Sequence, residues 1–170
     1  YVYKNGVYLS VDHCESAFVE DVKTHFDGNY IEYAKLYYSE FARLLQKDKY
    51  DIVGHFDLVS KFNTGGKYYD EGNKEYQNAA LEVMALAKEI CPIVEMNTGA
   101  MSRKAKDTPY PAPFLLKEIL NQGGHIILNS DSHDLNHLDF YFDESIEILR
   151  SVGFRNIVQL LGGKFVEVEI

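Results

Sequence analysis

The sequence has few cysteines, a deficit of basic residues and no long apolar run. Its two cysteines, Cys14 and Cys91, offer neither a disulfide framework nor the spacing of a zinc site, so we expect the reducing setting of the cytoplasm. With 17 basic against 26 acidic residues, the formal charge is -9, which argues against nucleic acid and anionic membranes as partners. No apolar run approaches the ~20 residues of a membrane span, and no leader-like segment opens the chain.

The composition and length of the chain indicate one globular domain over residues 1–170. Hydrophobic residues make up 46% of the chain and charged residues 25%, which is ordinary for a soluble domain of this length. The negative net charge still permits a small anionic substrate, because a local cation can reverse the field inside a pocket.

Apolar residues recur at helical spacing in five segments. Helices are predicted over residues 15–26, 30–46, 75–90, 113–121 and 142–152. The second of these is rich in tyrosine, and we interpret its tyrosines as a packing face in preference to a binding face.

Shorter apolar runs alternate with these helices. The Asn5-Gly6 pair predicts a hairpin within residues 1–11. Strands are predicted from residue 51 to about His55, and over 93–99, 125–130, 156–161 and 165–170. Alternation of strands and helices with short connections is typical of a parallel α/β sheet or barrel, with its helices on the outside.

Three successive predicted strands end in polar residues. The first ends in His55, the second in Glu95 and Asn97, and the third leads into Asp131 and His133. In a parallel arrangement these ends share one rim, so the side chains are expected to gather there. Asp131 and His133 are two residues apart, so on an extended backbone both side chains leave on the same side and can converge on one cation.

Such a rim suits metal-assisted hydrolysis of a phosphate ester. A mixed set of imidazole and carboxylate ligands favours zinc, iron or manganese over calcium. A bound divalent ion makes hydroxide available near neutral pH, and two ions can clamp the attacking and leaving oxygens. Arg103 adds a planar, permanently charged fork that fits a phosphoryl group.

Each of these residues also has a structural interpretation. Asp131 can cap a turn, and His55 can be a hydrogen-bonded histidine of the core. Arg103 can be an ordinary surface arginine. Asp57 fits a loop cap or a hydrogen bond to a ligand better than it fits a metal ligand.

Four ordered segments resemble the histidinol-phosphatase branch of the PHP (polymerase and histidinol phosphatase) superfamily, from Tyr1 to about Phe154. They are Gly54-His55-Phe56-Asp57 within residues 51–58, Glu95-Met96-Asn97-Thr98-Gly99 with the following Ser102-Arg103, Thr108-Pro109-Tyr110-Pro111, and Asn129-Ser130-Asp131-Ser132-His133. The resemblance implies the C-terminal portion of a distorted (β/α)7 barrel. It also implies hydrolysis of L-histidinol phosphate to L-histidinol and phosphate, in histidine biosynthesis, with two or three divalent metal ions in the complete enzyme.

The resemblance also implies roles for single residues. His55, Asp131 and His133 are expected to bind metal, and Asp131 and His133 to be catalytic. Arg103, with Ser102, is expected to bind the substrate phosphate. The remaining polar residues of the rim are expected to hydrogen-bond to the ligands; these are Asp57, Glu95 and Asn97.

The chain departs from the family pattern at its start. Family members open with a His-x-His pair and supply three further ligands before the equivalent of His55, and none of these is present here. The chain therefore resembles the C-terminal two-thirds of such an enzyme, and we expect weak or no activity from it alone. Its expected partners are the missing N-terminal segment or a second copy. The alternatives are another phosphoesterase of the superfamily and a non-catalytic remnant that serves as an interaction module.

Overall fold

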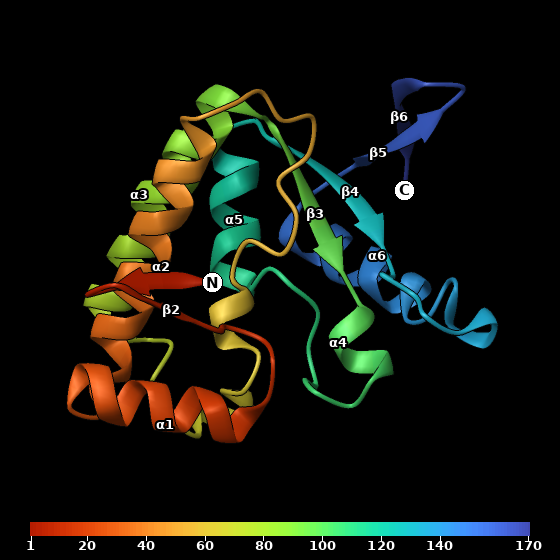
Figure 1. Ribbon diagram of the computed structural model, residues 1–170. Coiled ribbons are helices and arrows are strands. Elements are labelled where there is room, and N and C mark those ends of the chain that lie inside the picture. Colours follow the sequence, from red (N-terminus) through yellow and green to blue (C-terminus); the bar gives the residue numbers. More distant parts are fainter.

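A computed structural model describes all of residues 1–170 as a mixed α/β fold with two sheets (Figure 1). A small antiparallel hairpin stands first, and a four-stranded sheet in the order β3-β4-β5-β6 occupies the C-terminal half. The strands are β1 (Val2–Lys4), β2 (Val7–Leu9), β3 (Ile93–Asn97), β4 (His125–Asn129), β5 (Asn156–Leu161) and β6 (Lys164–Glu169). The helices are α1 (Glu15–Phe26), α2 (Tyr30–Leu45), α3 (Lys74–Ile90), α4 (Gly99–Ser102), α5 (Pro113–Asn121) and α6 (Phe142–Val152), with short 3-10 turns at Leu58–Ser60, Thr64–Gly66 and Leu135–His137.

Local signals explain where the longer helices begin and end. The side chain of Asn29 accepts a hydrogen bond from the backbone N–H of Glu32 and so caps α2. Asn73 caps α3 in the same way. Gly153 ends α6 with φ 118°, a left-handed conformation that favours glycine. All five predicted helices are confirmed, to within one residue at each end.

The four-stranded sheet is mostly parallel. β3 pairs with β4 and β4 with β5 in parallel, whereas β6 returns antiparallel to β5. In Figure 1, β3 and β4 run side by side in the same direction, and the β5–β6 hairpin projects at the edge of the sheet beyond β4. The parallel α/β prediction is therefore confirmed, and the barrel stays a prediction.

The predicted strand that ends at His55 is wrong in its extent. Only Val53 pairs with β3, through one parallel bridge to Val94, and the chain turns into a 3-10 helix at Leu58. His55 has φ 47°, which ends the extended backbone. Sequence alone did not reveal this turn, because the apolar run continues through it.

The core is a single cluster of 31 buried hydrophobic residues. Tyrosines carry much of its volume: Tyr33, Tyr38 and Tyr76 are fully buried, and the hydroxyls of Tyr38 and Tyr76 lie 3.2 Å apart between α2 and α3. Paired hydroxyls allow such large aromatic rings to be buried without an unsatisfied polar group. The packing interpretation of the tyrosines in α2 is therefore confirmed. None of the helices combines the length and apolarity needed to cross a membrane.

Candidate functional site

The polar ends of neighbouring parallel segments meet at one rim of the sheet. Val53 is bridged to β3, and β3 pairs with β4 in a register that sets Asn97 opposite Asn129. The side chains of His55, Glu95 and Asp131 consequently come into contact, although they are up to 76 positions apart in the sequence (131 − 55). This gathering is what parallel strand ends predict.

The carboxylate of Asp131 lies at the centre of the group. Its Oδ2 is 3.6 Å from Nε2 of His55, and its Oδ1 is 3.6 Å from Nε2 of His133. Arg103 reaches the same residue twice, because Nη2 donates to Oδ2 at 2.9 Å and Nη1 donates to the backbone oxygen at 2.9 Å. One carboxylate therefore contacts two imidazoles and a guanidinium.

Glu95 holds His55 from the other side. Its Oε2 lies 3.1 Å from Nδ1 of His55 and accepts the backbone N–H of the same residue at 3.1 Å. Its Oε1 accepts a hydrogen bond from Nδ2 of Asn129 at 2.9 Å. Five side chains thus form a continuous series: Asn129, Glu95, His55, Asp131 and His133.

Two residues of this series have left-handed backbones. Both His55 and Asp131 have φ 47°, a conformation that is uncommon outside glycine and costs free energy. The prediction that Asp131 lies on an extended segment is therefore wrong. Asp131 and His133 still come within contact distance, because the chain turns sharply after β4.

The charges of the group shift two pKa values in opposite directions. Contact with Glu95 raises the pKa of His55 above its usual range, against the opposing effect of burial, and the nearby charge of Asp131 adds to the rise. Burial alone would raise the pKa of Glu95, but its bonds to His55 and Asn129 outweigh burial and lower it. Glu95 is therefore ionised at neutral pH.

The three other predicted residues hydrogen-bond to backbone groups and not to the candidate ligands. The hydroxyl of Ser102 donates to the backbone oxygen of Gly99 at 2.9 Å, within its own helix. Asp57 is fully buried and accepts the backbone N–H of Ala112, so it supports a loop and makes no hydrogen bond to His55. The side-chain oxygen of Asn97 accepts the backbone N–H of Gly99. The structure therefore joins Glu95 to the candidate ligands and leaves these three residues in supporting positions.

Two contributors were not predicted. Asn129 anchors Glu95, and the hydroxyl of Tyr37 donates to the backbone oxygens of His55 and Phe56 at 3.2 and 3.0 Å. Asn129 is the last residue of β4 and the first polar residue after its apolar run, and could have been found there. Tyr37 belongs to the packing face of α2, and nothing in its local pattern distinguishes it from its neighbours.

Gly99 allows the ends of β3 and β4 to approach each other. A Cβ at this position would lie 2.7 Å from the backbone oxygen of Ser130 and 3.0 Å from Cβ of Asp131. Because a backbone oxygen cannot move aside alone, a side chain here would force the two strand ends apart.

We expect Gly99→Ala to lower the free energy of unfolding by about 1–2 kcal/mol, from the overlap with Ser130 less the gain from a stiffer unfolded chain. Urea denaturation measures the change. Gly72→Ala is the matched control, because its Cβ would meet only the side chain of exposed Asp70, at 3.1 Å. Equal stability of the two variants would contradict the close approach.

The donor types of the group suit a divalent transition metal, since two imidazoles and a carboxylate are mixed N/O ligands. No three His, Cys, Asp or Glu side chains in the structure form a group that could hold a metal ion. The donors follow one another in a series, and Arg103 occupies the oxygen of Asp131 that faces His55. The chemical types of these residues fit a metal ion. For them to surround one ion, the carboxylate of Asp131 must turn away from Arg103.

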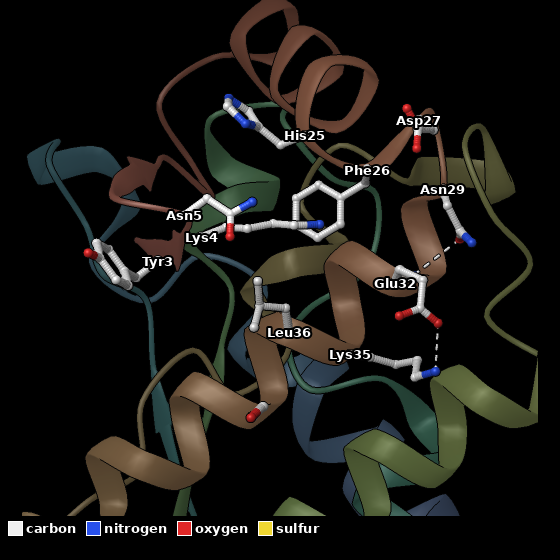
Figure 2. A pocket seen from close by; sticks show the side chains of 11 residues that line it. Tyr3, Lys4, Asn5, His25, Phe26, Asp27, Asn29, Glu32, Lys35 and Leu36 are labelled. Atoms are coloured by element: carbon white, nitrogen blue, oxygen red, sulfur yellow. Dashed lines mark hydrogen bonds and ion pairs between the residues drawn. The ribbon is translucent and has the colours of Figure 1, made fainter.

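A large open pocket lies elsewhere, between the β1–β2 hairpin and helices α1 and α2 (Figure 2). Its volume is about 880 Å³. Its cationic groups are partly engaged, because Lys35 pairs with Glu32 at 2.6 Å and Lys4 stands over the ring of Phe26 at 3.5 Å. None of the predicted site residues lines it, so size alone does not locate the chemistry of this chain.

Comparison with known proteins agrees with the predicted resemblance in part. The chain is 29% identical over 124 residues to a protein of Deinococcus radiodurans named probable histidinol-phosphatase, and this covers 71% of the chain and 43% of that protein. It is 26% identical over 128 residues to a protein of Schizosaccharomyces pombe with the same name, covering 75% of the chain and 42% of that protein. The matched part is thus less than half of each relative. No family model matches the chain.

Proposed function

We propose that this chain carries part of the active site of a metal-dependent phosphoric monoester hydrolase whose substrate is L-histidinol phosphate. The observation that supports this most is the contact of one carboxylate, that of Asp131, with His55, His133 and Arg103 at the ends of parallel strands. Such a group combines metal-ligand chemistry with a donor for phosphate. The names of the two similar proteins favour the same reaction.

We assign the metal to His55, Asp131 and His133. Zinc, manganese and iron suit this ligand set, and further ligands outside these three would complete a site of two or three ions. A divalent ion, when bound, makes hydroxide available near neutral pH and offsets negative charge on the phosphate. The imidazole of His133 is 73% exposed and can reorient toward an ion more freely than His55 can.

Arg103 is assigned to the substrate phosphate. Its guanidinium already uses two nitrogens on one residue, and this two-pronged geometry also fits two oxygens of a phosphate. In the proposed reaction Arg103 turns from Asp131 to the phosphate, which frees the carboxylate for the metal. The two events are coupled, because one oxygen of Asp131 cannot serve the guanidinium and the ion fully at once.

The substrate is a net anion, because its phosphate outweighs the charge of its ammonium group. In a chain of net charge -9, the guanidinium of Arg103 supplies the local positive charge that binding of such an anion requires. The resemblance of residues 108–111 to the histidinol-phosphatase branch supports this substrate over other small phosphate esters.

In the complete polypeptide that carries this chain, Arg103→Lys is expected to raise KM for the phosphate ester about 10-fold, equivalent to about 1.4 kcal/mol, with a smaller change in kcat. Lysine keeps the charge and loses the fork, so binding of two phosphate oxygens should suffer most. Initial rates over a range of substrate concentrations separate the two constants. Arg155→Lys, at an exposed position beyond α6, is the control. An unchanged KM would remove Arg103 from the phosphate site.

The function is tested by phosphate release from L-histidinol phosphate, from glycerol phosphate and from a nucleoside monophosphate. Each is assayed with Mn²⁺, with Zn²⁺ and with a chelator, with protein in excess of substrate so that slow turnover is recorded. The complete polypeptide that carries this chain is assayed in parallel. We expect metal-dependent release that is fastest from L-histidinol phosphate. A faster reaction with another ester, or no metal-dependent release from either protein, would contradict the proposal.

A further inference from the structure

We propose that Glu95 is a positioning residue that determines which ring nitrogen of His55 is free to bind a cation. The inference rests on the proposed function, because it takes His55 as a metal ligand. A single oxygen of Glu95, Oε2, contacts both the backbone N–H and the ring Nδ1 of His55, each at 3.1 Å. One carboxylate oxygen thus constrains the backbone and the ring of the same residue.

Glu95 is itself held in place. It lies on β3, between Val53 on one side and β4 on the other, and its side chain is 11% exposed. Asn129 fixes its Oε1. A Cβ at Gly54 would stand 3.3 Å from Oε2, closer than most real Cβ contacts, so the missing side chain there leaves room for the carboxylate.

The position of Glu95 favours one tautomer of the neutral imidazole. A carboxylate beside Nδ1 stabilises a proton on that nitrogen, which leaves Nε2 with a free lone pair. Nε2 faces Asp131 at 3.6 Å, toward the centre of the group. Asp131 competes less well for the ring proton, because it is farther from the ring, more exposed and already paired with Arg103.

The same contact maintains the left-handed backbone of His55. Oε2 of Glu95 accepts the N–H of His55, and the hydroxyl of Tyr37 donates to its C=O at 3.2 Å. Both polar groups of this peptide segment are thus satisfied where no sheet partner is present. A residue held from both sides can keep its ring directed at Asp131 at the cost of backbone strain.

Glu95→Gln tests the assignment, because glutamine keeps the size of the side chain but no longer favours a proton on Nδ1. The first measurement is the tautomer of His55, from ¹⁵N NMR of the ring in the metal-free chain, at a pH where the same spectra show a neutral imidazole. We expect the Nδ1-protonated form to dominate in the unchanged chain and the Nε2-protonated form to gain at its expense in the variant. Glu82→Gln, at an exposed position on α3, is the matched control and should leave the tautomer unchanged.

The second measurement is the affinity for Zn²⁺ alone, by titration calorimetry. We expect Glu95→Gln to weaken binding about 10–100-fold, the usual effect of removing a carboxylate that orients a ligating histidine. If this variant does not fold, Asn129→Ala serves instead, because it releases Oε1 and should shift the tautomer in the same direction. An unchanged tautomer, or unchanged zinc affinity in a folded variant, would overturn the inference.

The tautomer measurement needs neither metal nor turnover. A shifted tautomer in a protein that hydrolyses no phosphate ester would retain the positioning role and remove the proposed function. Hydrolysis of L-histidinol phosphate with no tautomer shift in Glu95→Gln would retain the proposed function and remove the positioning role.

Discussion

In the complete polypeptide that carries this chain, Asp131→Asn is expected to reduce metal-dependent release of phosphate from L-histidinol phosphate about a thousandfold. The carboxylate is the one group that contacts both imidazoles and Arg103, and the variant removes its charge while keeping its shape. Loss of a metal ligand forfeits several kcal/mol of transition-state stabilisation, and about 4 kcal/mol corresponds to a factor of a thousand. Initial rates at saturating Mn²⁺ measure the loss.

Asparagine is the appropriate replacement because Asp131 has φ 47°, and asparagine is among the few residues that adopt this conformation readily. The variant should therefore unfold in urea at nearly the concentration that unfolds the original chain. Asp139→Asn, at an exposed position before α6, is the control and should keep full activity. Activity of Asp131→Asn within about threefold of the original would remove this carboxylate from the reaction.

The stability of the chain depends on pH through the buried carboxyl group of Asp57. Burial raises the pKa of Asp57 to about 6, against the lowering effects of Lys106 and of the hydrogen bond from Ala112. In the unfolded chain an aspartate has a pKa of about 3.9. Between these two values the folded state binds more protons than the unfolded state, so stability falls as pH rises. The difference of about two pKa units predicts a loss of about 2 kcal/mol between pH 4 and pH 7 from this residue alone, because the unfolded aspartate is already half ionised at pH 4.

Urea denaturation at several values between pH 4 and pH 7 tests this dependence. Other groups titrate in the same window, and the low pKa of Glu95 acts in the opposite direction, so the quantity to compare is the difference between the chain and Asp57→Asn. Asparagine keeps an acceptor for the N–H of Ala112 and does not titrate. The difference should change by about 2 kcal/mol across the window, and a constant difference would show that Asp57 titrates normally.

The helices were predictable because their signals are local. Residues 15–26, 113–121 and 142–152 carry apolar spacing, and turn residues such as Gly153 follow at their ends. The extent of the first predicted strand of the sheet was not predictable. Whether residues 51–59 pair depends on β3, some 40 positions away, and on the turn at His55. Hydrophobic pattern indicates burial there, and it does not indicate how many residues find a hydrogen-bonding partner.

Some contacts of the candidate site were likewise predictable from the sequence, and others were not. Polar residues after apolar runs predicted that His55, Glu95 and Asp131 would meet, because parallel strands align their ends. The contact of Tyr37 depends on the packing of a distant helix and left no comparable signal in the sequence, whereas Asn129 directly follows an apolar run and could have been predicted. The left-handed backbones of His55 and Asp131 were likewise unexpected, since neither position is a glycine.

Binding of a catalytic metal by the group around Asp131 can be observed by anomalous diffraction from crystals grown with Zn²⁺. We predict an anomalous peak at about 2.0–2.2 Å from Nε2 of His55 and from a carboxylate oxygen of Asp131, with Nδ1 of His55 still facing Glu95. Absence of a peak at Asp131 when zinc is in excess, or peaks confined to other carboxylates of the surface, would contradict it.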